Sequence, residues 1–173
     1  MKNNSCTEDG EEEYYCDICK YSEKYVIEAH GHYYRNYVCQ HCDKIERTEV
    51  TNSNVEKVMR YLFTFKNDEL YAYDAFSNTS KNSVTSTNVE ANSVSEFSIK
   101  ATRKITVSFK YSFSSDDIGK LLITTPTTQL EYDHGSDTLS MTLEKGQEMV
   151  FRFERSDVIY DNCYVRIGQI VIS

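Results

Sequence analysis

Four of the six cysteines are spaced as metal ligands are. They form two CxxC pairs, Cys16–Cys19 and Cys39–Cys42, with nineteen residues between the pairs. A two-residue spacing lets both thiolates of a pair face one ion from a tight turn, and two such turns complete a tetrahedral site. The pattern therefore predicts a structural Zn²⁺ bound by Cys16, Cys19, Cys39 and Cys42, with no coordination position left for a reacting water.

The sequence also allows two other uses of these cysteines. They could form two disulfides if the chain is secreted. A redox-active pair would be expected to open a helix in a βαβ unit, which the surrounding sequence does not contain. His30, His32 and His41 are expected at the surface, and His32 is the substitute ligand if one thiolate lies elsewhere. Cys6 is left as a free thiol or an intermolecular crosslink.

The segments around the two pairs indicate how they would be positioned. Residues 24–28, 32–38 and 44–50 are predicted strands of a small three-stranded zinc ribbon spanning residues 14–52. Residues 1–13 are dense in acidic side chains, which repel one another and bury nothing, so they are predicted to form an acidic tail. The polar string at residues 51–54 then links the ribbon to a second module at residues 53–173.

The second module is a succession of short strands. Residues 104–113 alternate, with Ile105, Val107, Phe109, Tyr111 and Phe113 on one face, and this period of two is typical of a half-buried strand. Turn-forming residues separate such segments, and no long helical period is present. This pattern predicts an all-β chain whose larger part is an antiparallel sandwich. The other strands are expected at residues 60–65, 94–100, 120–125, 138–143, 148–155 and 163–172.

Overall charge and hydropathy limit the partners. The chain has 173 residues with 27 Asp and Glu against 19 Lys and Arg, a net charge of −8. A nucleic-acid partner is not expected, because phosphate contacts require a basic surface. No apolar run approaches the about 18 residues of a membrane helix, so insertion into a membrane is not expected. No leader is visible, so the expected location is the cytoplasm, or the cell surface if a secreted chain has been truncated.

Several segments of the second module resemble, in order, the strands of a known sandwich family. Residues 97–115, 145–153 and 160–170 are similar to strands of a jelly-roll module of bacterial surface proteins, of the carbohydrate-binding and MAM-like kind, and residues 77–92 to its Ser/Asn-rich segment. The resemblance implies a jelly-roll sandwich that binds a glycan or a surface protein. Tyr164 replaces the tryptophan common in that family, and Arg166 replaces an acidic residue of its last strand.

Glycan binding would require exposed aromatic rings that stack on the sugar, with polar side chains beside them. Alternatively, the same tyrosines cover the edges of the sandwich. The candidate ligand-binding residues are Tyr71, Tyr73, Phe76, Tyr132, Tyr160, Asp74, Asp133, His134 and Asp161.

No sequence motif of a reaction class is present. GxSxG, P-loop, HExxH and GxGxxG patterns are absent, and paired carboxylates such as Asp116 and Asp117 lie in predicted turns. The sequence therefore predicts a chain that is not an enzyme, acting as a binding or adhesion module of a bacterial surface protein. One alternative is a self-assembling subunit of a surface appendage or particle, crosslinked through Cys6. Another is an intracellular zinc-ribbon adaptor.

Overall fold

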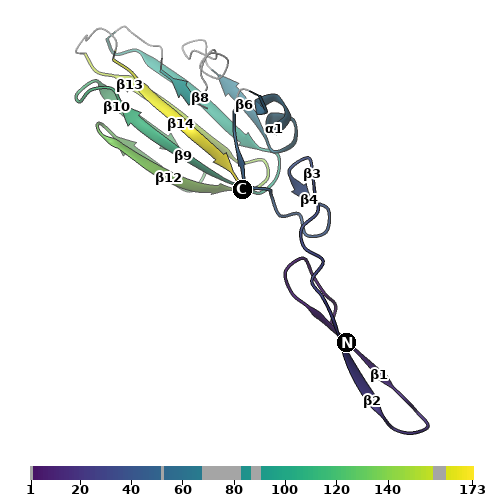
Figure 1. Ribbon diagram of the computed structural model, residues 1–173. Coiled ribbons are helices and arrows are strands. Elements are labelled where there is room, and N and C mark those ends of the chain that lie inside the picture. The colour runs from purple at the N-terminus through teal and green to yellow at the C-terminus, as the bar shows by residue number, and fades with distance from the viewer. Residues whose placement is uncertain (1, 52, 68–82, 87–90, 158–162) are drawn as a thin grey trace. The chain divides into compact units, whose positions relative to one another are not determined.

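The computed structural model describes residues 2–51, 53–67, 83–86, 91–157 and 163–173 (Figure 1). The chain divides into two compact units, Met1–Glu46 and Arg47–Ser173. Each unit is described by itself below.

The first unit consists of two antiparallel hairpins. Strands β1 (Gly10–Tyr15) and β2 (Ser22–Ile27) pair along their whole length. Strands β3 (Tyr34–Arg35) and β4 (Val38–Cys39) are joined by Asn36 and Tyr37, which have φ values of 53° and 68°. Two consecutive positive φ angles are characteristic of the tight turn that connects hairpin strands. Residues 10–13, expected in the acidic tail, belong to β1.

The second unit is built almost entirely of strands, which confirms the predicted all-β class. One short helix accompanies them. The elements are β5 (Thr48–Glu49), α1 (Val55–Tyr61), β6 (Phe63–Asn67), β7 (Ser83–Thr85), β8 (Val94–Ala101), β9 (Ile105–Phe113), β10 (Gly119–Thr124), β11 (Gln129–Tyr132), β12 (Ser136–Leu143), β13 (Glu148–Arg155) and β14 (Val165–Ile172).

These strands form two antiparallel sheets that lie face to face (Figure 1). One sheet has the order β11-β10-β13-β8-β6. The other has the order β12-β9-β14, and both β5 and β7 pair with β14. From β7 to β14, every connection except the one between β10 and β11 passes from one sheet to the other. This winding is that of a jelly roll, as the sequence predicted.

Aromatic side chains from both sheets fill the core of the sandwich. Phe151 of β13 is fully buried, stacks on Phe97 of β8 at 4.5 Å between ring centroids, and meets the edge of Phe109 of β9 at 4.9 Å. Because β9 belongs to the opposite sheet, this trio joins the two layers. Burying each such ring stabilises the fold by about 1.5–3 kcal/mol, and edge-on or stacked pairing of the rings adds to it.

Strand β14 contains an irregularity that lets one edge serve two partners. Its pairing with β9 shifts register between Gly168 and Val171, and Gln169 has a φ of 52°. On its other edge, β14 pairs with β7 over Arg166–Gly168 and with β5 at Val171 and Ile172. An extra residue in one strand bends it and increases its local twist. Strand β7 therefore pairs with β14 before the bend, and β5 pairs with it after the bend.

Alanine at Gly119 is expected to destabilise the sandwich more than alanine at Gly146. Gly119 has a φ of 143°, and a Cβ there would lie 2.2 Å from the carbonyl oxygen of Glu154 on β13. Gly146 has a φ of 86° with nothing within 4 Å. Gly146→Ala should lower the free energy of unfolding by about 1–2 kcal/mol, because it places a residue with a side chain in the left-handed region. Gly119→Ala should cost more, and equal urea midpoints for the two variants would contradict this packing.

Candidate metal centre

A group of four potential metal ligands lies in the first unit. Cys6, His32, Cys39 and Cys42 bring their ligand atoms within 4.8 Å of one another. The Sγ atoms of Cys6 and Cys39 are 3.7 Å apart, and Nδ1 of His32 is 3.4 Å from Sγ of Cys42. The cluster therefore unites three thiols and an imidazole, a donor set typical of structural zinc.

The distances within the cluster suit a tetrahedral zinc ion. With Zn–S near 2.3 Å and Zn–N near 2.0–2.1 Å, two sulfurs on one ion are about 3.8 Å apart, and a sulfur and a nitrogen about 3.5 Å. The two distances given above differ from these by little. The other ring nitrogen of His32, Nε2, is buried without a hydrogen-bond partner among the described residues.

A tight turn after β4 positions Cys39 and Cys42. The N–H of Cys39 donates to the carbonyl of Lys44 at 2.9 Å, and the N–H of Asp43 donates to the carbonyl of Cys39 at 3.2 Å. Asp43 has a φ of 59°, which closes the turn. His32 lies just before β3, so the β3–β4 hairpin brings its ring back to this turn.

Cys6 is held in the cluster by a turn of its own. The N–H of Ser5 donates to the carbonyl of Glu8, and the N–H of Glu8 donates to the hydroxyl of Ser5. The N–H of His30 donates to the carbonyl of Ser5 at 3.2 Å, which ties this turn to the segment that carries His32. Cys6 is only 7% exposed as a result. That burial removes the exposed thiol on which the expected intermolecular crosslink would depend.

The cluster stabilises negative charge on one sulfur. Burial alone would raise the pKa of Cys39, but backbone N–H groups of His41 and Cys42 and the ring of His32 donate to its sulfur and lower the pKa to about 5. The pKa of Cys6 is raised to about 12, by burial first and then by its contacts with Cys42 and Cys39. A cation bound among these sulfurs would compensate the charge that burial otherwise disfavours.

The structure does not bring together the four cysteines that the sequence selected. Cys39 and Cys42 are in the cluster, whereas Cys16 and Cys19 lie in the turn between β1 and β2, where Cys19 is exposed. Cys6 and His32 occupy the remaining positions. The sequence offered His32 as a substitute ligand but gave no sign of Cys6, because its position depends on the turn at Ser5–Glu8 and not on spacing. The three strands predicted for the ribbon do not form one sheet: residues 24–28 overlap β2, which pairs with β1, residues 32–38 turn back as the β3–β4 hairpin, and β5, within residues 44–50, pairs with β14.

The candidate glycan-binding residues are separated into three groups. Tyr132 is half-buried, with its ring 4.4 Å from that of Tyr111, so one face of the ring packs against that neighbour. Asp133 and His134 are exposed, in contact with each other, in the turn before β12. The remaining candidates, Tyr71, Tyr73, Asp74, Phe76, Tyr160 and Asp161, lie outside the described residues.

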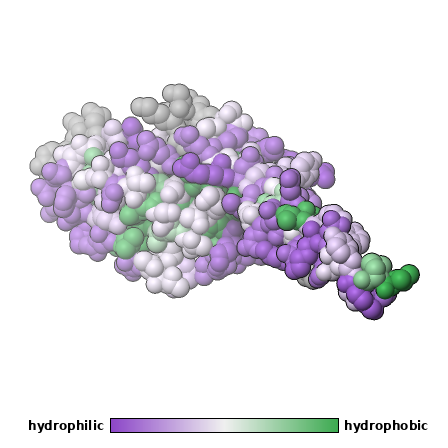
Figure 2. Space-filling model, turned by 60° about the horizontal axis from the view of Figure 1, so that its bottom comes forward, coloured by the Kyte–Doolittle hydropathy of each residue, from purple (hydrophilic) through white to green (hydrophobic). Residues whose placement is uncertain are grey.

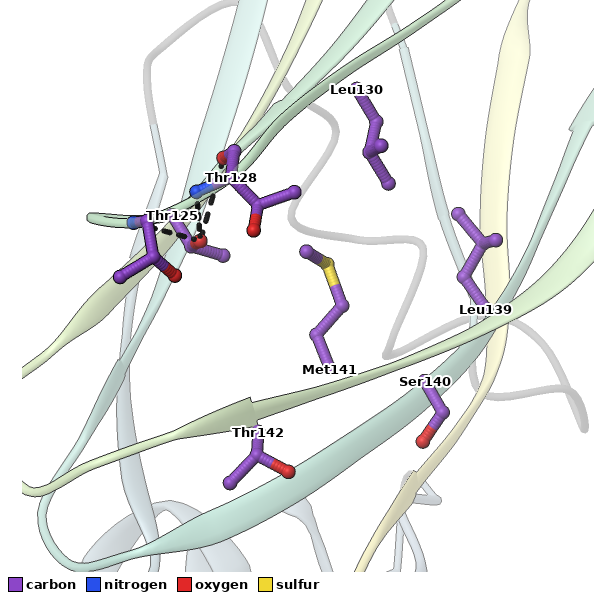
Figure 3. A pocket seen from close by; sticks show the side chains of 8 residues that line it. Thr125, Thr128, Leu130, Leu139, Ser140, Met141 and Thr142 are labelled. Carbon is purple, nitrogen blue, oxygen red and sulfur yellow. Dashed lines mark hydrogen bonds between the residues drawn. The ribbon is translucent and has the colours of Figure 1, made fainter.

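An open pocket of about 340 Å³ lies between the β10–β11 turn and β12 (Figure 3). Leu130 of β11 and Leu139 and Met141 of β12 line it with apolar side chains, and the rest of the lining is hydroxyl-bearing. None of the lining side chains is charged or aromatic. The hydroxyl of Thr125 accepts hydrogen bonds from backbone N–H groups of the turn, which fix its shape. The hydroxyl-bearing lining residues are Thr125, Thr127, Thr128, Ser140 and Thr142. The sequence gave no indication of this pocket.

Among the described residues, no helix has the length and apolar character needed to cross a bilayer.

Comparison with known proteins gives a likeness of fold. No protein-family model matches the chain, and neither does any curated protein. A secreted serine protease, VesC from Vibrio cholerae, is similar in structure with a TM-score of 0.52 and 11% sequence identity. The match covers 88% of this chain, which spans 30% of the length of the protease chain. The enzymatically active domain of tailspike protein 4 from bacteriophage CBA120 matches with a TM-score of 0.33 and 9% identity, over 74% of this chain and 18% of that one.

One of these neighbours overturns an expectation from the sequence. The absence of reaction motifs predicted that the chain is not an enzyme, but the structure it resembles at a TM-score of 0.52 is that of a secreted serine protease. Missing motifs are therefore no ground for excluding catalysis, since catalytic groups are recognised by geometry rather than by local sequence. At these identities the likeness is one of fold, and it assigns no catalytic residue to this chain.

Proposed function

We propose that the chain is a zinc-containing binding module whose sandwich receives an extended segment of a partner protein. The observation that carries the proposal is the uncharged pocket between β11 and β12. The metal centre has the separate task of holding the first unit in its folded form.

The structural role of the metal follows from the number of protein ligands. Three thiolates and one imidazole fill a tetrahedral shell and leave no position for water or substrate. The first unit buries few large apolar side chains, namely Val38 and Ile45 beside the cysteines. A unit of 46 residues with so small a core would depend on metal binding for much of its folding free energy.

The pocket suits an extended polypeptide because it lies between two sheet edges. Within the described residues, β11 pairs with β10 alone and β12 with β9 alone. Each strand thus has an edge whose backbone N–H and C=O groups can pair with an added strand. Leu130, Leu139 and Met141 would contact apolar side chains of that segment. A sugar is less suited, because no aromatic ring lines the pocket.

The proposal is tested with a peptide library and matched lysine variants. We expect a random twelve-residue display library, selected on the immobilised full chain, to yield peptides that alternate apolar and polar residues. Met141→Lys should weaken their binding about tenfold or more, because it places a charge against apolar side chains. Thr138→Lys adds the same charge at an exposed position of β12 outside the pocket and should leave binding unchanged.

A glycan array probed with the same protein provides the contrasting outcome. Binding to glycans without selection of peptides would contradict the proposal, and so would peptides that bind both lysine variants equally.

A further inference from the structure

The turn that carries Cys16 and Cys19 has a specific hydrogen-bond pattern. The N–H of Cys16 donates to the carbonyl of Tyr21 at 2.8 Å, and the N–H of Lys20 donates to the carbonyl of Cys16 at 2.8 Å. The N–H of Cys19 donates to Sγ of Cys16 at 3.4 Å. Lys20 has a φ of 60°. The backbone therefore wraps around the sulfur of the first cysteine.

The same pattern occurs in the turn that carries Cys39 and Cys42. There the first cysteine also donates to the carbonyl five residues later, Lys44, and accepts at its own carbonyl from the residue four later, Asp43. The φ of Asp43 is 59°, within 1° of that of Lys20. The backbone N–H of Cys42 again donates to the sulfur of the first cysteine. The two CxxC turns thus have one conformation, and one of them belongs to a complete set of ligands.

Within the part of the chain that the structure describes, the turn between β1 and β2 has only two metal ligands, Cys16 and Cys19. Among residues 2–51, 53–67, 83–86, 91–157 and 163–173, one group of at least three potential metal ligands lies close together. It is the cluster of Cys6, His32, Cys39 and Cys42, called the Cys6 cluster below, and it does not include Cys16 or Cys19. Two thiols supply half of a tetrahedral shell. None of the described residues supplies the other half, and the exposed position of Cys19 leaves the turn open to ligands from another molecule.

The surface around this turn is suited to a protein neighbour. Tyr14, Tyr15 and Tyr21 are 56–62% exposed, and Ile18, between the two cysteines, is 95% exposed. Figure 2 shows hydrophobic surface at this end of the hairpin. Every residue of β2 is exposed, and a two-stranded hairpin with both faces in water is marginally stable. Apolar surface gathered in this way is typical of a contact site between proteins.

The charges of the turn favour a second copy of the same chain as that neighbour. The turn carries one acidic residue, Asp17, and one basic residue, Lys20, whose Nζ lies 5.7 Å from the centre of the Tyr15 ring. Two copies related by a twofold axis present the same patch to each other, so Asp17 of one can face Lys20 of the other. A second copy also supplies the same two thiols and the same apolar side chains.

We propose that Cys16 and Cys19 of two copies bind one Zn²⁺ between them and so join two chains. Zinc bound by four thiolates forms a closed site. The reaction is a ligand exchange without oxidation or reduction: four thiols, two from each chain, release four protons to the buffer as one Zn²⁺ is bound by four sulfurs. The site is distinct from the Cys6 cluster, and it does not depend on the pocket of the sandwich.

The zinc content and mass of the full chain test this proposal. Under a phosphine reductant and with a slight excess of ZnCl₂, we expect 1.5 zinc ions per chain, one in the Cys6 cluster and a half share of the joint site. The mass by light scattering should be twice the 20.1 kDa of one chain. The double variant Cys16→Ser/Cys19→Ser should bind 1.0 zinc per chain and be monomeric. Cys163→Ser, a cysteine outside both sites, should behave as the wild type.

Three results would overturn the proposal. Wild type that is monomeric with one zinc, together with a double variant that has none, would place Cys16 and Cys19 in the same intrachain site as Cys39 and Cys42. One zinc in both proteins would mean that the turn binds no metal. A dimer that persists in the double variant, or in the wild type after a chelator, would assign the contact to other residues.

Discussion

Serine in place of Cys6 is expected to remove the metal from the first unit and to unfold it. Cys6 supplies one of four ligands, with its sulfur 3.7 Å from that of Cys39, and a serine hydroxyl is a poor substitute for a thiolate on zinc. We expect zinc affinity at this site to fall by at least about a hundredfold, since even partners outside the coordination shell contribute about 10–100-fold. Competition with a chromophoric chelator measures it.

The control for this prediction is serine in place of Cys16. That residue lies outside the cluster, so Cys16→Ser should retain one tightly bound zinc per chain and a folded β3–β4 hairpin. The opposite outcome, in which Cys16→Ser loses the zinc and Cys6→Ser keeps it, would show that the two CxxC pairs share one ion. The assignment of Cys6 and His32 as ligands would then be wrong.

The same chemistry predicts that a chelator affects the two units unequally. Removing zinc should abolish the ordered backbone signals of residues 30–46. The sandwich should keep its own unfolding midpoint, because none of the four cluster ligands belongs to the second unit. Loss of both units in one transition would contradict this independence. Two-dimensional NMR of the zinc-loaded and chelated protein distinguishes the results.

Alanine in place of Phe151 is the substitution expected to destabilise the sandwich most. The ring is fully buried between Phe97 in its own sheet and Phe109 in the opposite one, so its removal leaves a cavity that both layers border. Phe→Ala changes in such positions cost about 3–5 kcal/mol. That is a large part of the about 5–15 kcal/mol by which a domain is typically stable.

Leu139→Ala is the matched control for this second prediction. Leu139 is only half-buried on the edge strand β12, so its truncation removes less apolar contact and leaves no closed cavity. We expect about 1 kcal/mol or less for it. Urea unfolding of the full chain, followed at the transition of the sandwich, compares the two. A cost for Phe151→Ala no greater than that for Leu139→Ala would contradict the described core.

The strands of the sandwich were predictable where alternation is strict. Residues 148–155 were expected as a strand, and β13 has those bounds, with every second residue buried. Residues 104–113 were likewise expected, and β9 covers 105–113. Strands β5 and β7 have two and three residues, which is too short to show an alternating pattern in the sequence. They form because each pairs with an edge of β14.

The metal centre was predictable in part. The spacing of Cys39 and Cys42 identified them, because a tight turn is a local feature that two intervening residues determine. The dense acidic residues before the first CxxC pair indicated an unfolded tail, and this hid Cys6. In the structure one of these carboxylates, Glu11, is 2.7 Å from Lys24 across the β1–β2 hairpin, which lowers the pKa of Glu11. Pairing across a hairpin thus relieves the repulsion that composition alone suggested.

The pocket between β11 and β12 could not be read from the sequence for a different reason. Leu139 and Met141 follow the alternation of an ordinary strand, and nothing local marks them as partly exposed. Their exposure arises because β11 ends one sheet and β12 ends the other. Which strand lies at an edge depends on the winding of the whole jelly roll.

The position of β14 has a consequence for how the protein is made. Strand β14 lies between β9 on one side and β5 and β7 on the other, and it is synthesised after all three of them. While the ribosome adds residues one at a time, β9, β5 and β7 have to wait with unpaired edges until β14 appears. The first unit, whose contacts are local, can fold long before then. On a nascent chain of this protein the four potential ligands can therefore be assembled while one sheet is still open.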